Sequence, residues 1–266
     1  MGMRFHKMHG LGNDFVIVDG REQVAKITPE LARAIADRHR GVGCDQLILV
    51  GNSNKADVSM RIWNHDGGEV ESCGNASRCV VALTGAKTIE TPAGIIEGAS
   101  EGSEVEVSMI EPRFGWEDIP LSYPMDTADL PLGWDGLKHG FAVNVGNPHI
   151  VFFVTDPDTV ELDVYGPRIE NDPLFPERIN VHVAAVRDDG IHMRSWERGA
   201  GLTLACGTGA CAVAVAAIAT KRAMSPVAVH MPGGTLTVAW EQGGPVRMRG
   251  SATHVFEGEL DPEAFR

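Results

Sequence analysis

The chain has 266 residues, which suits one large or two modest domains, and its 43% apolar and 22% charged residues are typical of a globular protein. No apolar run approaches the about 18 residues of a membrane-spanning helix, and the formal net charge of −13 argues against a nucleic-acid partner. Met1–Lys7 lacks the apolar core of a signal peptide, and the cysteine count of five is odd, so we expect a reducing, cytoplasmic location.

The first half of the chain predicts short strands and two helices. Thr28 can cap a surface helix that begins at Pro29 and ends before Gly41. Ala76–Leu83 predicts a second helix, and because its residues are apolar nearly all round, this helix should be buried. Apolar or alternating segments predict strands at 15–18, 47–50, 58–63 and 105–109.

The second half repeats this arrangement after a linker at Glu111–Asp118. Ala210–Ala219 predicts another helix that is apolar on every side and therefore buried. Residues 120–138 carry no pattern that assigns them to a strand or a helix. Strands are predicted at 150–154, 181–186, 191–196, 227–230 and 236–240.

Short motifs recur in the same order in both halves, which indicates an internal duplication. After the cysteines the spacing of the matches grows to 140, which predicts that the second buried helix is about two turns longer than the first. The residues that match at a spacing of 133 or 134 are Asn13 and Asn147, Gln46 and Asn180, Trp63 and Trp196, and Cys73 and Cys206.

We therefore expect an α/β (α+β) fold with two pseudo-symmetric domains, each a strand-rich, barrel-like sheet wrapped around a buried central helix. The first domain would comprise residues 1–113, together with a C-terminal strand at about 253–266 that can pack back onto it. The second domain would comprise residues 114–252. Two related domains would face each other across a pseudo-twofold axis, so the active site is expected in the cleft between them.

Each buried helix begins directly after a cysteine. The first turn of a helix offers free N–H groups and a positive dipole end, which bind carboxylates and lower the pKa of a cysteine. Gly74 and Gly207 allow a ligand to approach the backbone closely. Cys73 and Cys206 on opposite sides of one cleft could remove a proton from a carbon and return one from the other face. This arrangement predicts inversion of a stereocentre.

The sequence predicts neither a cofactor nor a metal. Neither a GxGxxG motif after a strand nor a Walker A motif is present, and Lys87 and Lys221 lie at helix ends, where surface lysines are common. The pairs Cys73/Cys79 and Cys206/Cys211 are too widely spaced for a structural zinc site, and the absence of CxxC disfavours a thiol redox protein. The remaining three cysteines are interpreted as inert core residues; they are Cys44, Cys79 and Cys211.

The motifs resemble those of the diaminopimelate epimerase family over nearly the whole chain. They are Lys7–Phe15 (KMHGLGNDF), Cys73-Gly74-Asn75, Gly146–His149 (GNPH) and Glu197–Gly201 (ERGAG), which runs on to Cys206–Cys211 (CGTGAC). The resemblance implies interconversion of LL- and meso-2,6-diaminopimelate without pyridoxal phosphate, on the route to lysine and peptidoglycan, by a cytoplasmic homodimer.

The resemblance also implies roles for individual residues. Cys73 and Cys206 would be the acid–base pair, and His149 and Glu197 would tune the cysteines or anchor an amine. The substrate would be held by Asn13, Gln46, Asn64, Gly74, Asn75, Asn147, Asn180, Glu197, Arg198, Gly207 and Thr208.

Three other functions stay open at this point. A proline racemase relative would use the same two cysteines, although the GNPH motif and Glu197-Arg198 favour diaminopimelate. An isomerase of the same fold without a cysteine pair is disfavoured by Cys73 and Cys206. An amino-acid-binding protein would bind the substrate but exchange no Cα proton, so an exchange measurement distinguishes it from an enzyme.

Overall fold

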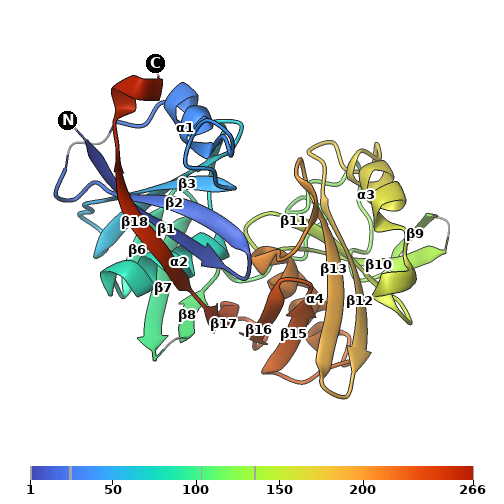
Figure 1. Ribbon diagram of the computed structural model, residues 1–266. Coiled ribbons are helices and arrows are strands. Elements are labelled where there is room, and N and C mark those ends of the chain that lie inside the picture. Colours follow the sequence, from blue (N-terminus) through green and yellow to red (C-terminus); the bar gives the residue numbers. More distant parts are fainter. Residues whose placement is uncertain (1, 24–25, 103, 135, 266) are drawn as a thin grey trace. The chain divides into compact units, whose positions relative to one another are not determined.

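A computed structural model describes residues 2–23, 26–102, 104–134 and 136–265. The chain divides into two compact units, which we call the N-terminal unit (Met1–Val107 and Gly250–Arg266) and the C-terminal unit (Ser108–Arg249). The end of the chain returns to the N-terminal unit because β18 (Thr253–Leu260) pairs antiparallel with β1 (Met3–Gly10), as the red and blue strands of Figure 1 show.

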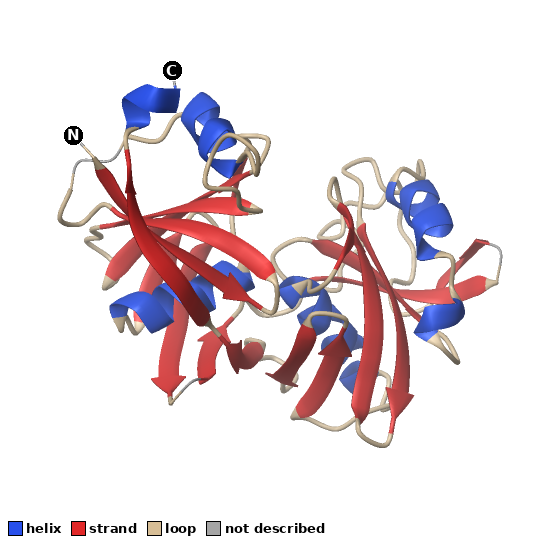
Figure 2. Ribbon diagram, viewed as in Figure 1, coloured by secondary structure: helices blue, strands red, loops and turns tan. Residues whose placement is uncertain are grey.

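Strands dominate both units (Figure 2). The other strands that begin in the N-terminal unit are β2 (Asn13–Asp19), β3 (Gln46–Gly51), β4 (Val58–Asn64), β5 (Glu69–Val70), β6 (Thr88–Thr91), β7 (Gly94–Glu101) and β8 (Glu104–Ser108). Those that begin in the C-terminal unit are β9 (Leu130–Trp134), β10 (Leu137–Asn144), β11 (Pro148–Phe153), β12 (Asn180–Arg187), β13 (Gly190–Glu197), β14 (Gly201–Thr203), β15 (Val227–Met231), β16 (Gly234–Ala239) and β17 (Arg247–Ser251). The helices are α1 (Pro29–Ala36), α2 (Gly74–Thr84), α3 (Leu162–Glu170) and α4 (Gly207–Ala219), with short 3₁₀ helices η1 (Pro157–Thr159) and η2 (Pro262–Phe265).

The two units share one strand topology. In the N-terminal unit β1 is antiparallel to β2, β2 is parallel to β3, and β3 is antiparallel to β4. In the C-terminal unit β10, β11, β12 and β13 repeat these three relations in order. Even the register repeats, because Phe15 lies opposite Gln46 and His149 lies opposite Asn180, each 134 residues later. The predicted duplication is thus present in the pairing of the backbone.

A buried helix lies inside each unit, as predicted. Residues 210–217 of α4 are all buried, and α4 contacts β10, β11, β12, β13, β15 and β16 of its own unit. Residues 74–81 of α2 are buried as well, and α2 contacts β1, β2, β7 and β18. Strands wrapped around α4 remove nearly its whole circumference from water, which explains why this helix carries no polar face.

The opposite face of each sheet is covered by a second helix. Ala32 and Ile35 of α1 pack with Val16 and Val18 of β2 in one hydrophobic cluster. In the C-terminal unit, Leu162 and Ile169 of α3 pack with Ile150 and Phe152 of β11. Each sheet is therefore buried on both faces, which agrees with the near-continuous apolar runs of its central strands.

All nine predicted strands are confirmed to within two residues, but two helix predictions need correction. Helix α1 ends at Ala36 and not near Gly41, because Asp37 adopts an extended conformation. Helix α4 exceeds α2 by two residues and not by two turns. Most of the inserted residues lie in the loop 220–226 before β15, where they disturb no buried helical turn. The unassigned segment 120–138 contains β9 and the start of β10.

Among the described residues, none of the helices has the length and apolar character needed to cross a membrane.

Candidate active site

In the N-terminal unit the predicted site residues gather where three strands end. Asn13 starts β2, Gln46 starts the parallel strand β3, and Asn64 ends the antiparallel strand β4, so all three lie at one edge of the sheet. Gln46 Nε2 donates to Asn64 Oδ1 at 2.9 Å. Asn13 Oδ1 accepts from Asn75 Nδ2 at 3.2 Å and from the Cys73 thiol at 3.9 Å. The first turn of α2 is thereby joined to the strand ends by side-chain amides.

An unsatisfied acceptor lies in this amide group. Gln46 Oε1 is buried and, among the described residues, it is the one buried side-chain oxygen or nitrogen without a hydrogen-bond partner. A buried acceptor without a donor costs about 1–3 kcal/mol, which a ligand that donates a hydrogen bond would recover. Gln46 is therefore suited to receive an N–H group of a substrate.

Arg78 was not predicted as a site residue, although it belongs to the first Cys-Gly helix. Its side chain is wholly buried, and its Nη2 donates to Asn75 Oδ1 at 2.8 Å. Its Nε donates to the carbonyl of Ser251 at 3.4 Å. The guanidinium thus fixes the Asn75 amide that in turn bonds Asn13. The signal in the sequence was a charged residue within a helix that was predicted to be buried.

The C-terminal unit places the equivalent residues at the equivalent edge. Asn180 starts β12, and Glu197 ends the antiparallel strand β13. Asn180 is buried, its Oδ1 accepts from the backbone N–H of Arg198 at 2.9 Å, and its Nδ2 donates to the carbonyl of Pro148 at 2.9 Å. The amide of Asn180 therefore braces the two segments that carry Glu197 and His149.

Cys206 is the N-cap residue of α4 and is buried. Its Sγ accepts from the backbone N–H of Gly209 at 3.3 Å and lies 3.6 Å from Thr208 Oγ1. Burial raises the pKa of the Cys206 thiol well above its usual range, and the Glu197 carboxylate raises it further; these effects outweigh the hydrogen bonds from Thr208 and Gly209. The prediction that the helix start lowers the cysteine pKa is thus wrong for Cys206, because burial of the thiol raises its pKa more than the hydrogen bonds at the helix start lower it.

A buried chain of hydrogen bonds lies beside Cys206. Asn147 Oδ1 bonds His149 Nε2 at 2.7 Å, His149 Nδ1 bonds His182 Nε2 at 2.8 Å, and His182 Nδ1 bonds Ser195 Oγ at 2.9 Å. An amide oxygen only accepts, so His149 Nε2 carries a proton, and both rings are satisfied in the neutral form. We call this chain, Asn147–His149–His182–Ser195, the histidine relay.

Burial keeps the histidine relay uncharged. It lowers the pKa of His182 to about 3, and it lowers the pKa of His149 well below its usual value, with His182 and Arg198 adding to the effect. His149 consequently orients the Asn147 amide and supplies no positive charge. His182 and Ser195 were not predicted, because only the pairing of β11 with β12 and of β12 with β13 brings them beside His149.

Gly209 permits close packing between the histidine relay and Cys206. A Cβ atom at this position would lie 2.5 Å from Cε1 of His182 and 3.0 Å from Sγ of Cys206. Real Cβ atoms do not approach so closely, so a residue with a side chain here would displace the imidazole ring or the sulfur. Gly209, the second glycine of CGTG, is thus required by its packing against His182 and Cys206.

The remaining predicted residues lie at the helix starts or at the end of β13. Gly74 and Gly207 are the first residues of α2 and α4. Glu197 Oε1 accepts from Thr203 Oγ1, and Arg198 Nη1 donates to the carbonyl of Glu177 at 2.9 Å. The three other cysteines, Cys44, Cys79 and Cys211, are buried. Burial raises the pKa of Cys44 and of Cys79 to about 12, which agrees with their interpretation as inert core residues.

Comparisons with known proteins identify the family to which the chain belongs. The family model described as diaminopimelate epimerase matches residues 5–114 and 141–255. A diaminopimelate epimerase from Sphingopyxis alaskensis is 58% identical over 267 residues, covering 100% of both chains. One from Zymomonas mobilis subsp. mobilis is 50% identical over 268 residues, again covering 100% of both chains.

A solved structure supports the fold at much lower identity. A hydroxyproline epimerase from Agrobacterium vitis, with bound trans-4-hydroxy-L-proline, superposes with a TM-score of 0.69 at 15% identity, covering 99% of this chain and 94% of that chain. The relation extends the common fold to a distant epimerase.

Proposed function

We propose that this chain, which belongs to the diaminopimelate epimerase family, interconverts LL- and meso-2,6-diaminopimelate by a two-base transfer of the Cα proton. The observation that carries the proposal is a pair of equivalent cysteines, Cys73 and Cys206, each at the N-cap of a buried helix in one half of a duplicated fold. Duplication supplies two similar proton-transfer groups, which is what inversion of a carbon centre requires.

The proposed reaction conserves protons and needs no redox partner. In one direction the Cys73 thiolate takes the Cα proton and becomes a thiol, while the Cys206 thiol gives its proton to the opposite face of Cα and becomes a thiolate. The reverse direction exchanges these roles. The raised pKa of Cys206 supports this assignment, because it keeps that sulfur protonated when the substrate arrives. Glu197 can accept the Cys206 proton when the reverse reaction needs a thiolate.

The carbanion formed at Cα must be stabilised by surrounding donors. The free N–H groups at the starts of α2 and α4 can bind the α-carboxylate, where negative charge develops. Gln46 Oε1 is free to accept a hydrogen bond from an ammonium group of the substrate. Arg198 can bind a carboxylate through two parallel hydrogen bonds. A site built from amides rejects amino acids that lack the second amino and carboxylate groups.

Asn147 and Asn75 have a supporting part in this proposal. The histidine relay holds the Asn147 oxygen, so its two N–H donors point away from His149 and are available to the substrate. Arg78 holds Asn75 in the same way in the other unit. Each half of the site thus owes its geometry to a buried charged or ring side chain in the layer behind it.

We also propose that the enzyme works in the cytoplasm as a homodimer, on the route to lysine and peptidoglycan, with no cofactor and no metal in the reaction. Family membership supports this assignment. Light scattering on the purified chain should give twice the 28.5 kDa of one chain. A mass of 28.5 kDa at micromolar concentration would contradict the dimer.

The decisive experiment is incorporation of solvent deuterium at Cα of LL-diaminopimelate, without an added cofactor and with proline and lysine as comparison substrates. We expect deuterium in diaminopimelate alone, together with the meso product. Incorporation into proline would show that the protein has a proline racemase activity instead. Absence of exchange in a folded, reduced sample would favour a binding protein.

The two-base assignment is tested by Cys73→Ala and Cys206→Ala, with Cys44→Ala as the matched control. Loss of a positioned acid or base costs about 10²–10⁴-fold in rate, so each site variant should lose measurable epimerisation while its circular dichroism spectrum is retained. Cys44→Ala should keep the rate of the original chain in the same assay. Full activity in either site variant would refute the assignment.

A further inference from the structure

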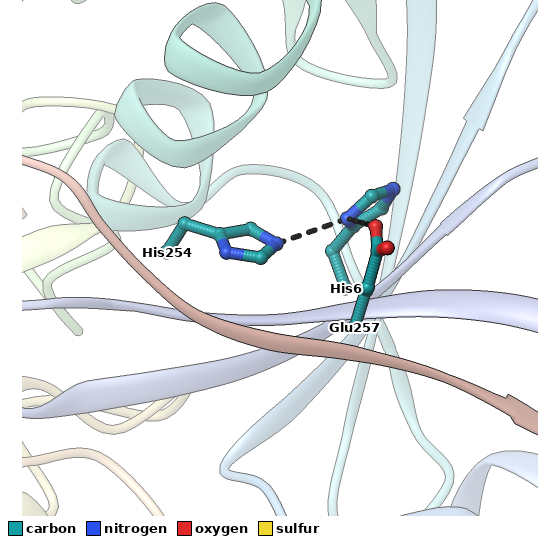
Figure 3. Close-up of side chains that lie close together, drawn as sticks. All are labelled: His6, His254 and Glu257. Carbon is teal, nitrogen blue, oxygen red and sulfur yellow. Dashed lines mark hydrogen bonds and ion pairs between the residues drawn. The ribbon is translucent and has the colours of Figure 1, made fainter.

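Two strands from opposite ends of the chain bring three ligating side chains together in the N-terminal unit. Figure 3 shows His6 from β1 with His254 and Glu257 from β18. His6 Nδ1 lies 3.1 Å from His254 Nε2 and 3.8 Å from Glu257 Oε2. The ligating atoms of the three residues all lie within 4.8 Å of one another. We call these residues the β1–β18 cluster.

A β-bulge is responsible for this convergence. His254 and Glu257 are three residues apart, so in a regular strand their side chains would point to opposite faces of the sheet. The register shifts at this place, because Lys7 lies opposite Phe256 whereas the next residue, Met8, lies opposite His254. Val255 is therefore the extra residue of a bulge, which turns His254 to the side on which His6 and Glu257 face each other.

We propose that the β1–β18 cluster binds a divalent first-row transition metal ion of the zinc type. Two imidazole nitrogens and one carboxylate are ligands that such ions prefer, with water completing the coordination. Two nitrogens bound to one tetrahedral ion at the usual bond lengths lie about 3.3 Å apart. The observed separation of 3.1 Å between His6 Nδ1 and His254 Nε2 is close to that value.

The surroundings of the cluster allow an ion to enter. The His6 side chain is 25% exposed and the Glu257 side chain 76% exposed, so water can reach the ligands. The Glu257 carboxylate offsets part of the positive charge of the ion. The search of the sequence for closely spaced metal ligands could not reveal this site, because its two histidines lie 248 residues apart in the chain.

A second cluster provides a matched control. Asp189, His192 and His230 also lie within 4.8 Å of one another. There, however, Asp189 already engages both rings: its Oδ1 lies 2.9 Å from His192 Nε2, and its backbone carbonyl lies 3.0 Å from His230 Nε2. In the β1–β18 cluster the two ring nitrogens are hydrogen-bonded to each other at 3.1 Å, so an ion placed between them would replace that one hydrogen bond.

The test is titration of the untagged, chelator-treated full chain with Co²⁺ and then Zn²⁺, followed by visible absorption and calorimetry. We expect one equivalent of ion that is lost in His6→Ala and in His254→Ala, and bound about tenfold or more weakly in Glu257→Gln. His192→Ala should bind as the original chain does. All five cysteines remain in every variant, so an ion held by thiols would appear equally in all of them.

Thermal unfolding supplies a second readout. An ion that binds only the folded state raises the Tm of the protein. Zn²⁺ should therefore raise the Tm of the original chain and of His192→Ala, and it should raise the Tm of Glu257→Gln much less. The same stoichiometry in the original chain, His6→Ala and His254→Ala would overturn the proposal. Loss of the ion in His192→Ala alone would overturn it too, because the ion would then occupy the second cluster.

Discussion

Acidification from pH 7 to pH 5 should destabilise the C-terminal unit through its two buried histidines. Both rings of the histidine relay are neutral when folded, with the pKa of His182 lowered to about 3 and that of His149 also lowered well below its usual value. In the unfolded chain both recover a pKa near 6.5 and bind protons. Because the folded pKa is the lower one, stability is lost as the pH falls below 6.5 and continues to fall towards the folded pKa.

The magnitude follows from these pKa values. Each pH unit below 6.5 favours the unfolded state by about 1.4 kcal/mol for each neutral buried histidine. At pH 5 the loss is about 2 kcal/mol for His182, and His149 adds to it in the same direction, which is large beside a total stability of about 5–15 kcal/mol. Asp14 does not contribute in this window, because its lowered pKa affects stability only below pH of about 4.

Urea unfolding followed by tryptophan fluorescence measures this loss. The signal reports mainly on the C-terminal unit, which contains Trp116, Trp134, Trp196 and Trp240. The variant His182→Leu should reduce the dependence of unfolding free energy on pH by about 1.4 kcal/mol per pH unit. His65→Ala, at an exposed position, should leave that dependence unchanged.

A free energy of unfolding that stays constant between pH 7 and pH 5 would refute this reasoning, because it would mean that the two rings ionise as readily in the folded chain as in the unfolded one. An unchanged pH dependence in His182→Leu would show that His182 is not one of the titrating groups.

Gly209→Ala should lower kcat and cost about 1–3 kcal/mol of stability, because its Cβ would lie 2.5 Å from His182 Cε1. Gly244→Ala should preserve both, because its Cβ would lie 3.4 Å from the nearest atom, the carbonyl oxygen of Glu241, and equal behaviour of the two variants would contradict the packing argument. Arg78→Met removes the donor to Asn75 Oδ1, so we expect a raised KM and a stability loss of about 1–3 kcal/mol by urea unfolding. Arg61→Met is the exposed control, and an unchanged KM in Arg78→Met would show that Arg78 does not position the substrate-binding residues. Mild oxidation with diamide should join Cys73 to Cys206 and abolish activity until a thiol reductant is added; an inactive oxidised sample in which alkylation still finds both thiols free would exclude that disulfide.

The sequence alone determined the duplicated architecture and the two cysteines. The matching motifs lie at a nearly constant spacing, so they remain visible before any strand is paired. The predicted helices at 76–83 and 210–219 are apolar nearly all round, which required their burial, and the structure confirms it. These features are local or periodic, so they can be recognised in the sequence before the three-dimensional structure is known.

Tertiary structure decided what surrounds those cysteines. The pKa of Cys206 depends on burial and on Glu197, which lies on β13 and not on the helix itself, so a rule about helix starts gave the wrong direction. Strand pairing assembles the histidine relay from β11, β12 and β13, and a single bulge in β18 creates the β1–β18 cluster. Desolvation and cross-strand hydrogen bonds arise only when distant segments pack together, and for that reason no spacing along the chain could reveal them.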